Sequence, residues 1–164
     1  TQASKEMIEE VERQFERAFG RHYGGLIEEY RSQDAETVLV TMGSASGTAK
    51  VIIDRLRDRG IPIGLIKVRY LRPFPHERLA RALAGKKAIG VIDRNVCFGW
   101  NSGTVFMELK AVLGQMGVKI PMANFIDGLA WLDITLEHVE RAANITMKAA
   151  RGEPFPEVTW FPLE

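Results

Sequence analysis

Hydrophobic and polar positions alternate along this chain with the period of a helix in some segments and of a strand in others. Near the amino terminus, apolar residues recur three and four positions apart with Glu and Arg between them, as in an amphipathic helix. They are Met7, Ile8, Val11, Phe15, Ala18 and Phe19. Gly20 is expected to end this helix. Residues 21–31 have two glycines and little periodicity, so they predict a connector with room for a short strand.

From Glu36 onward, short β-rich runs alternate with helical patterns. The expected strands are 37–42, 61–71, 88–93 and 118–126. A helical pattern follows each of them, and Gly60, Gly117 and Gly152 are expected to end three of these helices. Thr135 is the expected N-cap of the last helix. Strands that alternate with helices predict a mainly parallel sheet with helices on both faces.

Composition narrows the class of protein. A chain of 164 residues with 46% hydrophobic content fits one domain with a buried core. The formal charge of +1 gives no net field that favours nucleic acid or an acidic membrane surface. We find no apolar run near the ~18 residues that a membrane helix needs. The acidic amino terminus does not resemble a signal peptide, and the initial Thr indicates a piece of a longer protein or a processed start.

Cys97 is the one cysteine of the sequence. A single thiol excludes an internal disulfide, and it excludes cysteine-ligated iron–sulfur clusters and zinc fingers, which need several thiolates. A reducing cytoplasm is the expected compartment.

Three loops follow the predicted strands, at the sheet edge where open α/β folds bind ligands. The first contains Gly43, Ser44, Ser46, Gly47 and Thr48 at the start of a predicted helix, where amides and hydroxyls suit an anion. The sequence lacks the lysine of a P-loop and the spacings of other nucleotide or nucleophile motifs. The simpler interpretation is a tight turn in which both glycines shape the backbone and the hydroxyls cap the helix.

Basic residues mark the second loop. Lys67, Arg69 and Arg72 would suit a phosphate or a carboxylate, and Lys67 and Arg69 share a face if the strand extends to residue 71. A solvated face or protection of an edge strand is the simpler interpretation, and pairing across an interface is the other alternative. Pro73 and Pro75 end the strand and place the following residues in the first turn of a helix.

The third loop begins with Asp93, Arg94 and Asn95 directly after a predicted strand, and we expect an Asp–Arg pair to order it. A nucleophilic pair of Cys97 with His22, His76 or His138 has no support in the spacing, and His138 is expected at the surface. Phe98 and Trp100 either form a contact surface or turn inward to complete the core. Trp131 and Leu132, on the loop after the fourth strand, would join the same apolar patch.

Several of these stretches together resemble one family. They are YGGLIEEYRSQDAETVLVTMGSASGTAK, VRYLRPFP, IGVIDRNVCFGWNSG, FIDGL and DIT. In order and spacing they resemble the alpha chain of pyruvate:ferredoxin oxidoreductases and related 2-oxoacid enzymes, in the domain that is similar to the carboxyl-terminal domain of transketolase. The resemblance runs from about Tyr23 to Thr135.

The resemblance implies a three-layer α/β sandwich whose mostly parallel sheet has one antiparallel edge strand. It implies a linker helix at residues 1–22, the domain at residues 23–152 and a tail at residues 153–164. It also implies that this chain binds no cofactor and has no catalytic residue. The parent enzyme would use thiamine diphosphate, magnesium, iron–sulfur clusters and coenzyme A, held by other domains or subunits. Its partners would be those domains and subunits, ferredoxin and, in one alternative, a second copy.

One loop departs from the family pattern. Where relatives have a turn that contains Gly and Arg, this chain has Ala130, Trp131 and Leu132. This difference argues against an interface like that of the relatives at this loop, and it weakens assignment to the pyruvate-specific enzymes. Pyruvate is the expected substrate, but the RPFP motif also occurs in branched-chain 2-oxoacid enzymes, so the substrate stays open. The competing hypothesis is an independent domain that binds a small molecule or a nucleotide at the turn of residues 43–48.

Overall fold

A six-stranded sheet forms the centre of the computed structural model, which describes residues 1–161. The strand order is β1-β3-β2-β4-β5-β6, and β1 is antiparallel to β3 while the other neighbours are parallel. The strands are β1 (Ile27–Tyr30), β2 (Thr37–Met42), β3 (Ile63–Val68), β4 (Ala88–Asp93), β5 (Met122–Ile126) and β6 (Val158–Trp160). The expected sheet, mostly parallel with one antiparallel edge strand, is therefore confirmed.

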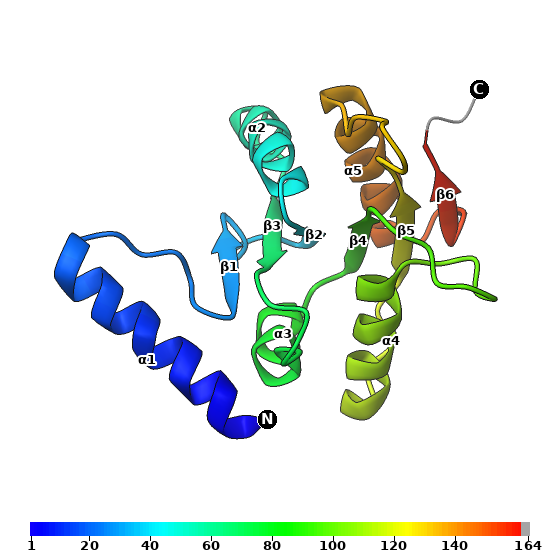
Figure 1. The fold of residues 1–164 in the computed structure, drawn as a ribbon. Coiled ribbons are helices and arrows are strands. Elements are labelled where there is room, and N and C mark those ends of the chain that lie inside the picture. Colours follow the sequence, from blue (N-terminus) through cyan, green and yellow to red (C-terminus); the bar gives the residue numbers. More distant parts are fainter. Residues whose placement is uncertain (162–164) are drawn as a thin grey trace.

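Helices cover both faces of this sheet (Figure 1). The helices are α1 (Gln2–Phe19), α2 (Ala45–Asp58), α3 (His76–Leu83), α4 (Thr104–Met116) and α5 (Leu136–Ala150). One apolar core joins α3 and α4 to one face, and a second core joins α2 and α5 to the other. The three-layer sandwich is thus confirmed. Its strands are buried on both faces, which explains their near-continuous Val, Ile and Leu content.

Gly90 shows how closely a helix approaches the sheet. A Cβ built on this glycine of β4 would lie 2.1 Å from Thr146 Oγ1 of α5 and 2.8 Å from Leu39 of β2. A side chain at this position would push α5 away, so the second core depends on a glycine here.

The structure corrects the limits of two predicted strands and adds one strand that was not predicted. The expected strand 61–71 is shorter, since β3 ends at Val68, and the expected strand 118–126 begins only at Met122 because Pro121 offers no N–H to a ladder. No sequence pattern indicates β6, which lies in the expected tail and pairs with β5. Residues 162–164 of that tail lie outside the described residues.

Helix α1 lies beyond β1, outside the sandwich (Figure 1). It ends at Gly20, whose φ of 65° is left-handed, as the sequence predicts. Its apolar face is not buried: Met7 is 68% exposed and Phe19 66%. The buried residue of this helix is Lys5. The helix therefore attaches to the sandwich by its charged face.

Candidate functional site

The candidate residues lie on or next to the loops that leave the carboxyl ends of β2, β3, β4 and β5. These strands are parallel to one another, so the loops emerge at one edge of the sheet, which we call the carboxyl edge. The loops are 43–44, 69–75, 94–103 and 127–135.

Only part of the predicted geometry of the first loop is present. Gly43 has a φ of 67°, a conformation that favours glycine, so its expected role in the turn is confirmed. Gly47 lies inside α2 and does not shape the turn, which corrects the second half of that prediction. Ser46 and Thr48 also lie inside α2, and Ser44 takes the N-cap position without a capping bond from its side chain. The prediction that these hydroxyls are chiefly caps is therefore wrong.

The Ser46 hydroxyl serves the interior instead. Its Oγ lies 2.8 Å from Thr41 Oγ1 of β2, and Ser46 is 2% exposed. The bond joins the first turn of α2 to the end of the strand before it. The Ser46 hydroxyl is thus used inside the domain, and the exposed residues of this segment are Gly43, Ser44 and Gly47.

The basic residues in and after β3 lie beside acidic residues of the same chain. Strand β3 lies between β1 and β2, so the predicted protection of an edge strand is wrong, and Lys67 is opposite Glu28 of β1. Arg69 lies past the end of β3 and so does not share a strand face with Lys67. Arg72 pairs with Glu108 of α4 at 2.6 Å. These contacts connect elements of the same domain.

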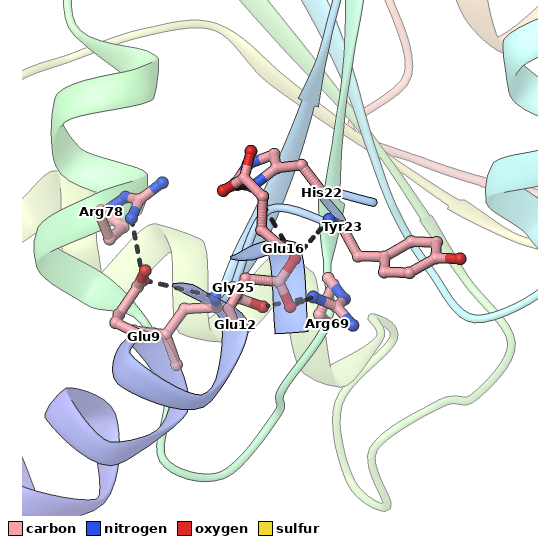
Figure 2. A network of polar contacts seen from close by, with 9 residues as sticks. Glu9, Glu12, Glu16, His22, Tyr23, Gly25, Arg69 and Arg78 are labelled. Atoms are coloured by element: carbon pink, nitrogen blue, oxygen red, sulfur yellow. Dashed lines mark hydrogen bonds and ion pairs between the residues drawn. The ribbon is translucent and has the colours of Figure 1, made fainter. Parts of the chain in front are cut away.

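Arg69 belongs to a group of ion pairs that hold α1, which we call the α1 clamp (Figure 2). Its guanidinium donates to Glu12 at 3.2 Å and to the carbonyl oxygen of Gly25 at 3.0 Å. Arg78 of α3 donates to Glu9 at 2.8 Å, and Lys5 donates to Glu77 at 2.7 Å.

Glu12 is the most enclosed carboxylate of the clamp and also accepts the backbone N–H of Tyr23. Burial acts to raise the pKa of Glu12, but the hydrogen bonds from Tyr23 and Arg69 outweigh it and the pKa is lowered. The hydrogen bond from Lys5 likewise lowers the pKa of Glu77. Both carboxylates are therefore stabilised in the charged form that the clamp needs.

A buried polar cluster fixes the third loop. Asp93, at the end of β4, accepts the backbone N–H groups of Val105 at 3.1 Å and Phe106 at 3.2 Å, at the start of α4. Asn124 of β5 donates to Asp93 at 3.0 Å and accepts the N–H of Gly103 at 2.8 Å. We call Asp93, Asn124 and their backbone donors the Asp93 cluster. It caps α4 in place of a side chain at the N-cap, which is Gly103.

Asn95 extends this capping. Its side-chain oxygen accepts the N–H of Thr104 at 2.9 Å and the Thr104 hydroxyl at 2.8 Å. Burial raises the pKa of Asp93, and the N–H donors of α4 and Asn124 oppose that rise. The side chains are thus engaged with backbone amides, which suits a structural role better than proton transfer to a substrate.

Arg94 does not pair with Asp93, so that prediction is wrong. Its Nε donates to the carbonyl oxygen of Gly128 at 3.1 Å and joins the loops after β4 and β5. Asp127 begins the second of these loops and lies 3.1 Å from Nδ1 of His138 in α5. Burial raises the pKa of Asp127, and the charge of His138 opposes the rise.

His138 is not the surface residue that we expected from the sequence. Its side chain is 19% exposed and its ring stacks on Phe161 at 5.2 Å. Sequence reasoning missed Asp127 and Asn124 as well. Asn124 could have been found from the sequence, because it lies in the middle of an apolar strand and a buried amide side chain needs hydrogen-bond partners.

Aromatic side chains at the carboxyl edge point away from the core. Phe98 is fully exposed, Trp131 is 90% exposed and Trp100 63%, and Leu132 is exposed as well. The alternative in which Phe98 and Trp100 complete the core is therefore wrong. Cys97 Sγ lies 3.4 Å from Thr104 Oγ1, and the three histidines have their contacts with Glu16, Lys5 and Asp127.

Residues 1–161 contain neither a cluster of metal-binding side chains nor a membrane-spanning helix. No group of three His, Cys, Asp or Glu side chains there is arranged to hold a metal ion. None of the helices in that range combines the length and the apolar character needed to cross a membrane.

Comparison with known proteins identifies relatives over nearly the whole chain. The alpha subunit of NADH-dependent phenylglyoxylate dehydrogenase from Aromatoleum evansii is 44% identical over 155 residues, which cover 94% of this chain and 37% of the relative. Pyruvate synthase subunit PorA from Methanosarcina barkeri is 38% identical, covering 88% and 36%. Ketoisovalerate oxidoreductase subunit VorA from Pyrococcus abyssi is 38% identical, covering 98% and 41%. The chain thus spans well under half the length of these relatives.

Two solved structures share the fold. A 2-oxoglutarate:ferredoxin oxidoreductase from Magnetococcus marinus matches with a TM-score of 0.55 and 16% identity, over 80% of this chain and 21% of that one. A split-gene transketolase matches with a TM-score of 0.59 and 15% identity, over 80% and 44%. The family described as pyruvate:ferredoxin oxidoreductase core domain II matches residues 35–139. With that match over most of the chain and three relatives above 30% identity, this chain belongs to the pyruvate:ferredoxin oxidoreductase core domain II family.

Proposed function

We propose that this chain is a non-catalytic interface domain of the alpha subunit of a thiamine-dependent 2-oxoacid:ferredoxin oxidoreductase. Such an enzyme decarboxylates a 2-oxoacid to acyl-coenzyme A and reduces ferredoxin. Membership of the family and the alpha-subunit relatives support the assignment. The observation that carries the interface role is the contrast at the carboxyl edge, where polar side chains bind backbone amides and aromatic side chains face solvent.

Phe98, Trp100 and Trp131 are the proposed anchors of the interface. A soluble domain rarely leaves large aromatic side chains this exposed unless they bind something, and aromatic residues dominate the centres of interfaces. The partners are the other domains and subunits of the oxidoreductase, and ferredoxin is a partner of the whole enzyme. In this proposal residues 1–22 are a linker helix, residues 23–152 the domain, and residues 153–164 a tail that includes the edge strand β6.

Two of the cofactors expected in the parent enzyme, the iron–sulfur clusters and magnesium, have no ligand set of the usual side chains in the described part of this chain. Iron–sulfur clusters need several thiolates, whereas the chain has one cysteine. The residues 1–161 have no group of metal ligands for the magnesium of thiamine diphosphate. We therefore assign magnesium and the iron–sulfur clusters to other parts of the enzyme. The family resemblance is the basis for assigning thiamine diphosphate and coenzyme A there too, and we assign no chemical step to this chain.

The choice of 2-oxoacid is also assigned to other parts of the enzyme. The relatives are named for three different substrates, phenylglyoxylate, pyruvate and ketoisovalerate, at 38–44% identity. Pyruvate is the first candidate substrate for the parent enzyme. An assay of that enzyme with the three 2-oxoacids decides among them.

Two measurements test the proposal. The purified chain, supplied with thiamine diphosphate, magnesium, coenzyme A, ferredoxin and each 2-oxoacid, is expected to give no turnover above a control without protein. In the parent enzyme, a Trp100→Ser, Trp131→Ser double variant is expected to weaken subunit association in native mass spectrometry. Val51→Ser, at a half-exposed apolar residue of α2, is the matched control. Turnover by the chain alone, or unchanged association in the double variant, overturns the proposal.

The competing ligand site at residues 43–48 has its own test. Binding of phosphate or a nucleotide there would raise the melting temperature of the chain in a saturable manner. Ser44→Ala would abolish that rise without lowering the stability of the free protein. The absence of any rise leaves the turn as a structural connection between β2 and α2.

A further inference from the structure

We propose that residues 153–161 are a strap that orders the loop of residues 94–103 and thereby fixes the positions of Phe98 and Trp100. We call residues 153–161 the tail strap and residues 97–102 the loop tip. The tail strap includes β6 and lies on the side of β5 that faces away from β4. The ordering of the loop is a property of this chain alone, whereas its consequence for docking rests on the proposed function.

The base of the loop is attached more firmly than its tip. The Asp93 cluster and Asn95 fix the two ends of the loop at the start of α4. The loop tip is closed by its own backbone, because the N–H of Cys97 donates to the carbonyl oxygen of Ser102 at 2.9 Å and the N–H of Trp100 donates to that of Cys97 at 3.0 Å. These two bonds set the shape of the turn, and they leave its direction to contacts with other elements.

A hydrogen bond from the tail strap supplies such a contact. Trp160 Nε1 of β6 donates to Asn101 Oδ1 at 2.9 Å. Among residues 1–161, this is the one hydrogen bond that joins residues 98–101 to a strand or a helix. Figure 1 shows the loop extending from the end of β4 past β5, toward the side of the sheet that β6 occupies. Trp160 is therefore a positioning residue for the loop tip.

Core packing does not fix the loop tip in place of this bond. A hollow of about 450 Å³ lies between the loop tip, α4 and the tail strap, and Trp100, Met107 and Val158 are among the residues that line it. Phe98 is fully exposed and Trp100 is 63% exposed, so neither ring enters the core. The placement of the tip therefore depends on its polar contact with Trp160.

The tail strap is attached at both ends of β6. The N–H of Asn124 donates to the carbonyl oxygen of Glu157 at 2.7 Å, and the N–H of Phe161 donates to that of Ile126 at 2.8 Å. The Phe161 side chain is buried in the core that joins α2 and α5 to the sheet. These contacts hold Trp160, the residue before Phe161, beside the loop tip.

The tail strap is also able to open. Strand β6 is three residues long and lies at the edge of the sheet. The hydroxyl of Thr159 is buried and has no hydrogen-bond partner within residues 1–161. A buried polar group without a partner costs free energy, so this hydroxyl disfavours the docked strand. A docked strap gives a fixed tip and an open strap a mobile one, and fixed aromatic side chains lose less entropy when they bind a partner.

Amide hydrogen exchange of the full chain, followed by NMR, tests the proposal. The reporters are the N–H groups of Cys97 and Trp100, because a mobile tip breaks the two bonds that close it more often. Trp160→Phe keeps an aromatic ring and removes the donor, and it is expected to raise both exchange rates about fivefold, the effect of one hydrogen bond. Trp131→Phe, the same substitution at a side chain that is 90% exposed, is expected to leave them unchanged.

A variant of the strap itself should act in the opposite direction. Thr159→Val removes the buried hydroxyl with little change in side-chain shape, so the docked strand becomes more stable. Exchange at the loop tip is therefore expected to be slower than in the wild type. The N–H groups of Val105 and Phe106, at the base of the loop, are expected to keep their protection in all three variants. They separate a local effect on the tip from a general loss of stability.

Three results would overturn the proposal. They are unchanged exchange at the loop tip in Trp160→Phe, equal acceleration in Trp160→Phe and Trp131→Phe, and exchange that is not slowed in Thr159→Val. None of these measurements involves a partner subunit or the turnover assay. This proposal and the proposed function can therefore fail separately.

Discussion

Two groups of polar side chains attach helices to this sheet, and they do so in opposite ways. The Asp93 cluster is buried, with Asp93 at 2% exposure, and it binds α4 through backbone amides. The α1 clamp lies near the surface and binds α1 through pairs of charged side chains such as Arg69–Glu12 and Lys5–Glu77. The attachment of α4 by the Asp93 cluster is therefore fixed, whereas the attachment of α1 by the α1 clamp is adjustable.

The difference teaches where the domain is rigid. A buried acceptor that satisfies several amides cannot be replaced by water, so breaking it exposes unpaired groups. The ion pairs of the clamp are only partly buried, and water can reach carboxylates such as Glu77, so breaking them leaves fewer groups without a partner. We therefore expect α4 to remain fixed as long as the sheet is folded, whereas α1 changes position at low free-energy cost.

The largest expected effect comes from removing the buried acceptor. Asp93→Ala leaves the N–H groups of Val105 and Phe106 without their partner, and Asn124 loses one of its bonds. We expect the free energy of unfolding to fall by about 3 kcal/mol or more, since each buried unpaired donor costs about 1–3 kcal/mol. Urea denaturation measures it. Asp133→Ala, at an exposed aspartate of the next loop, serves as control and should change stability by less than about 0.5 kcal/mol.

Acidification acts on the two groups with opposite sign. The pKa values of Glu12 and Glu77 are lowered from 4.5, so their contribution to stability is present above pH 4.5 and is lost as the pH falls through the folded-state values. The pKa values of Asp93 and Asp127 are raised from 3.8, so the folded state binds their protons more tightly. For these two, stability falls as the pH rises from 3.8 through the folded-state values, and acidification restores it.

We therefore expect acid to release α1 before it releases α4. Hydrogen-exchange protection factors measured from neutral pH to below pH 4.5 should fall first in α1, and protection of the first turn of α4 should persist. In a Glu12→Gln, Glu77→Gln variant, the early loss in α1 should no longer depend on pH. Simultaneous loss of protection in both helices would show that the clamp and the cluster are one cooperative unit.

Much of this architecture follows from the sequence, and the exceptions have physical causes. Strands such as β2 and β4 are runs of Val, Ile and Leu, and the helices between them have the period of a helix, so the sandwich could be predicted. Strand β6 has three residues and depends on pairing with β5, which no local pattern indicates. The resemblance to a known family supplied the antiparallel edge strand, because β1 has little periodicity of its own.

The site was harder to predict than the fold. Periodicity showed that α1 has an apolar face, but it did not show that Lys5 rather than Met7 would be buried. Asp93 was placed correctly at a strand end and then paired with the wrong partner, because its bonds go to amides that are more than ten residues away in sequence. Such contacts depend on how α4 packs against β4.

A smaller effect is expected from weakening the clamp at one carboxylate. Glu12→Gln keeps an acceptor for Tyr23 but removes the charge that Arg69 binds. We expect a loss of about 1 kcal/mol in the local stability of α1, and less of it at high salt. Limited proteolysis between α1 and β1 measures the release of the helix. Glu6→Gln, on the exposed side of α1, should leave the cleavage rate unchanged, and an equal acceleration in both variants would contradict a specific role of Glu12.

The smallest expected effect is a gain in stability at the carboxyl edge, next to the Arg94–Gly128 contact. Ala130 has a φ of 55°, the left-handed conformation that favours glycine. The left-handed conformation costs Ala130 about 1–2 kcal/mol, which glycine would not incur. Glycine loses more conformational entropy on folding, and this offsets part of the gain. Ala130→Gly should therefore raise the free energy of unfolding by about 0.5 kcal/mol. Ala84→Gly, at a φ of −58°, should lower it instead. A loss at both positions would mean that the loop conformation around Trp131 depends on the alanine side chain.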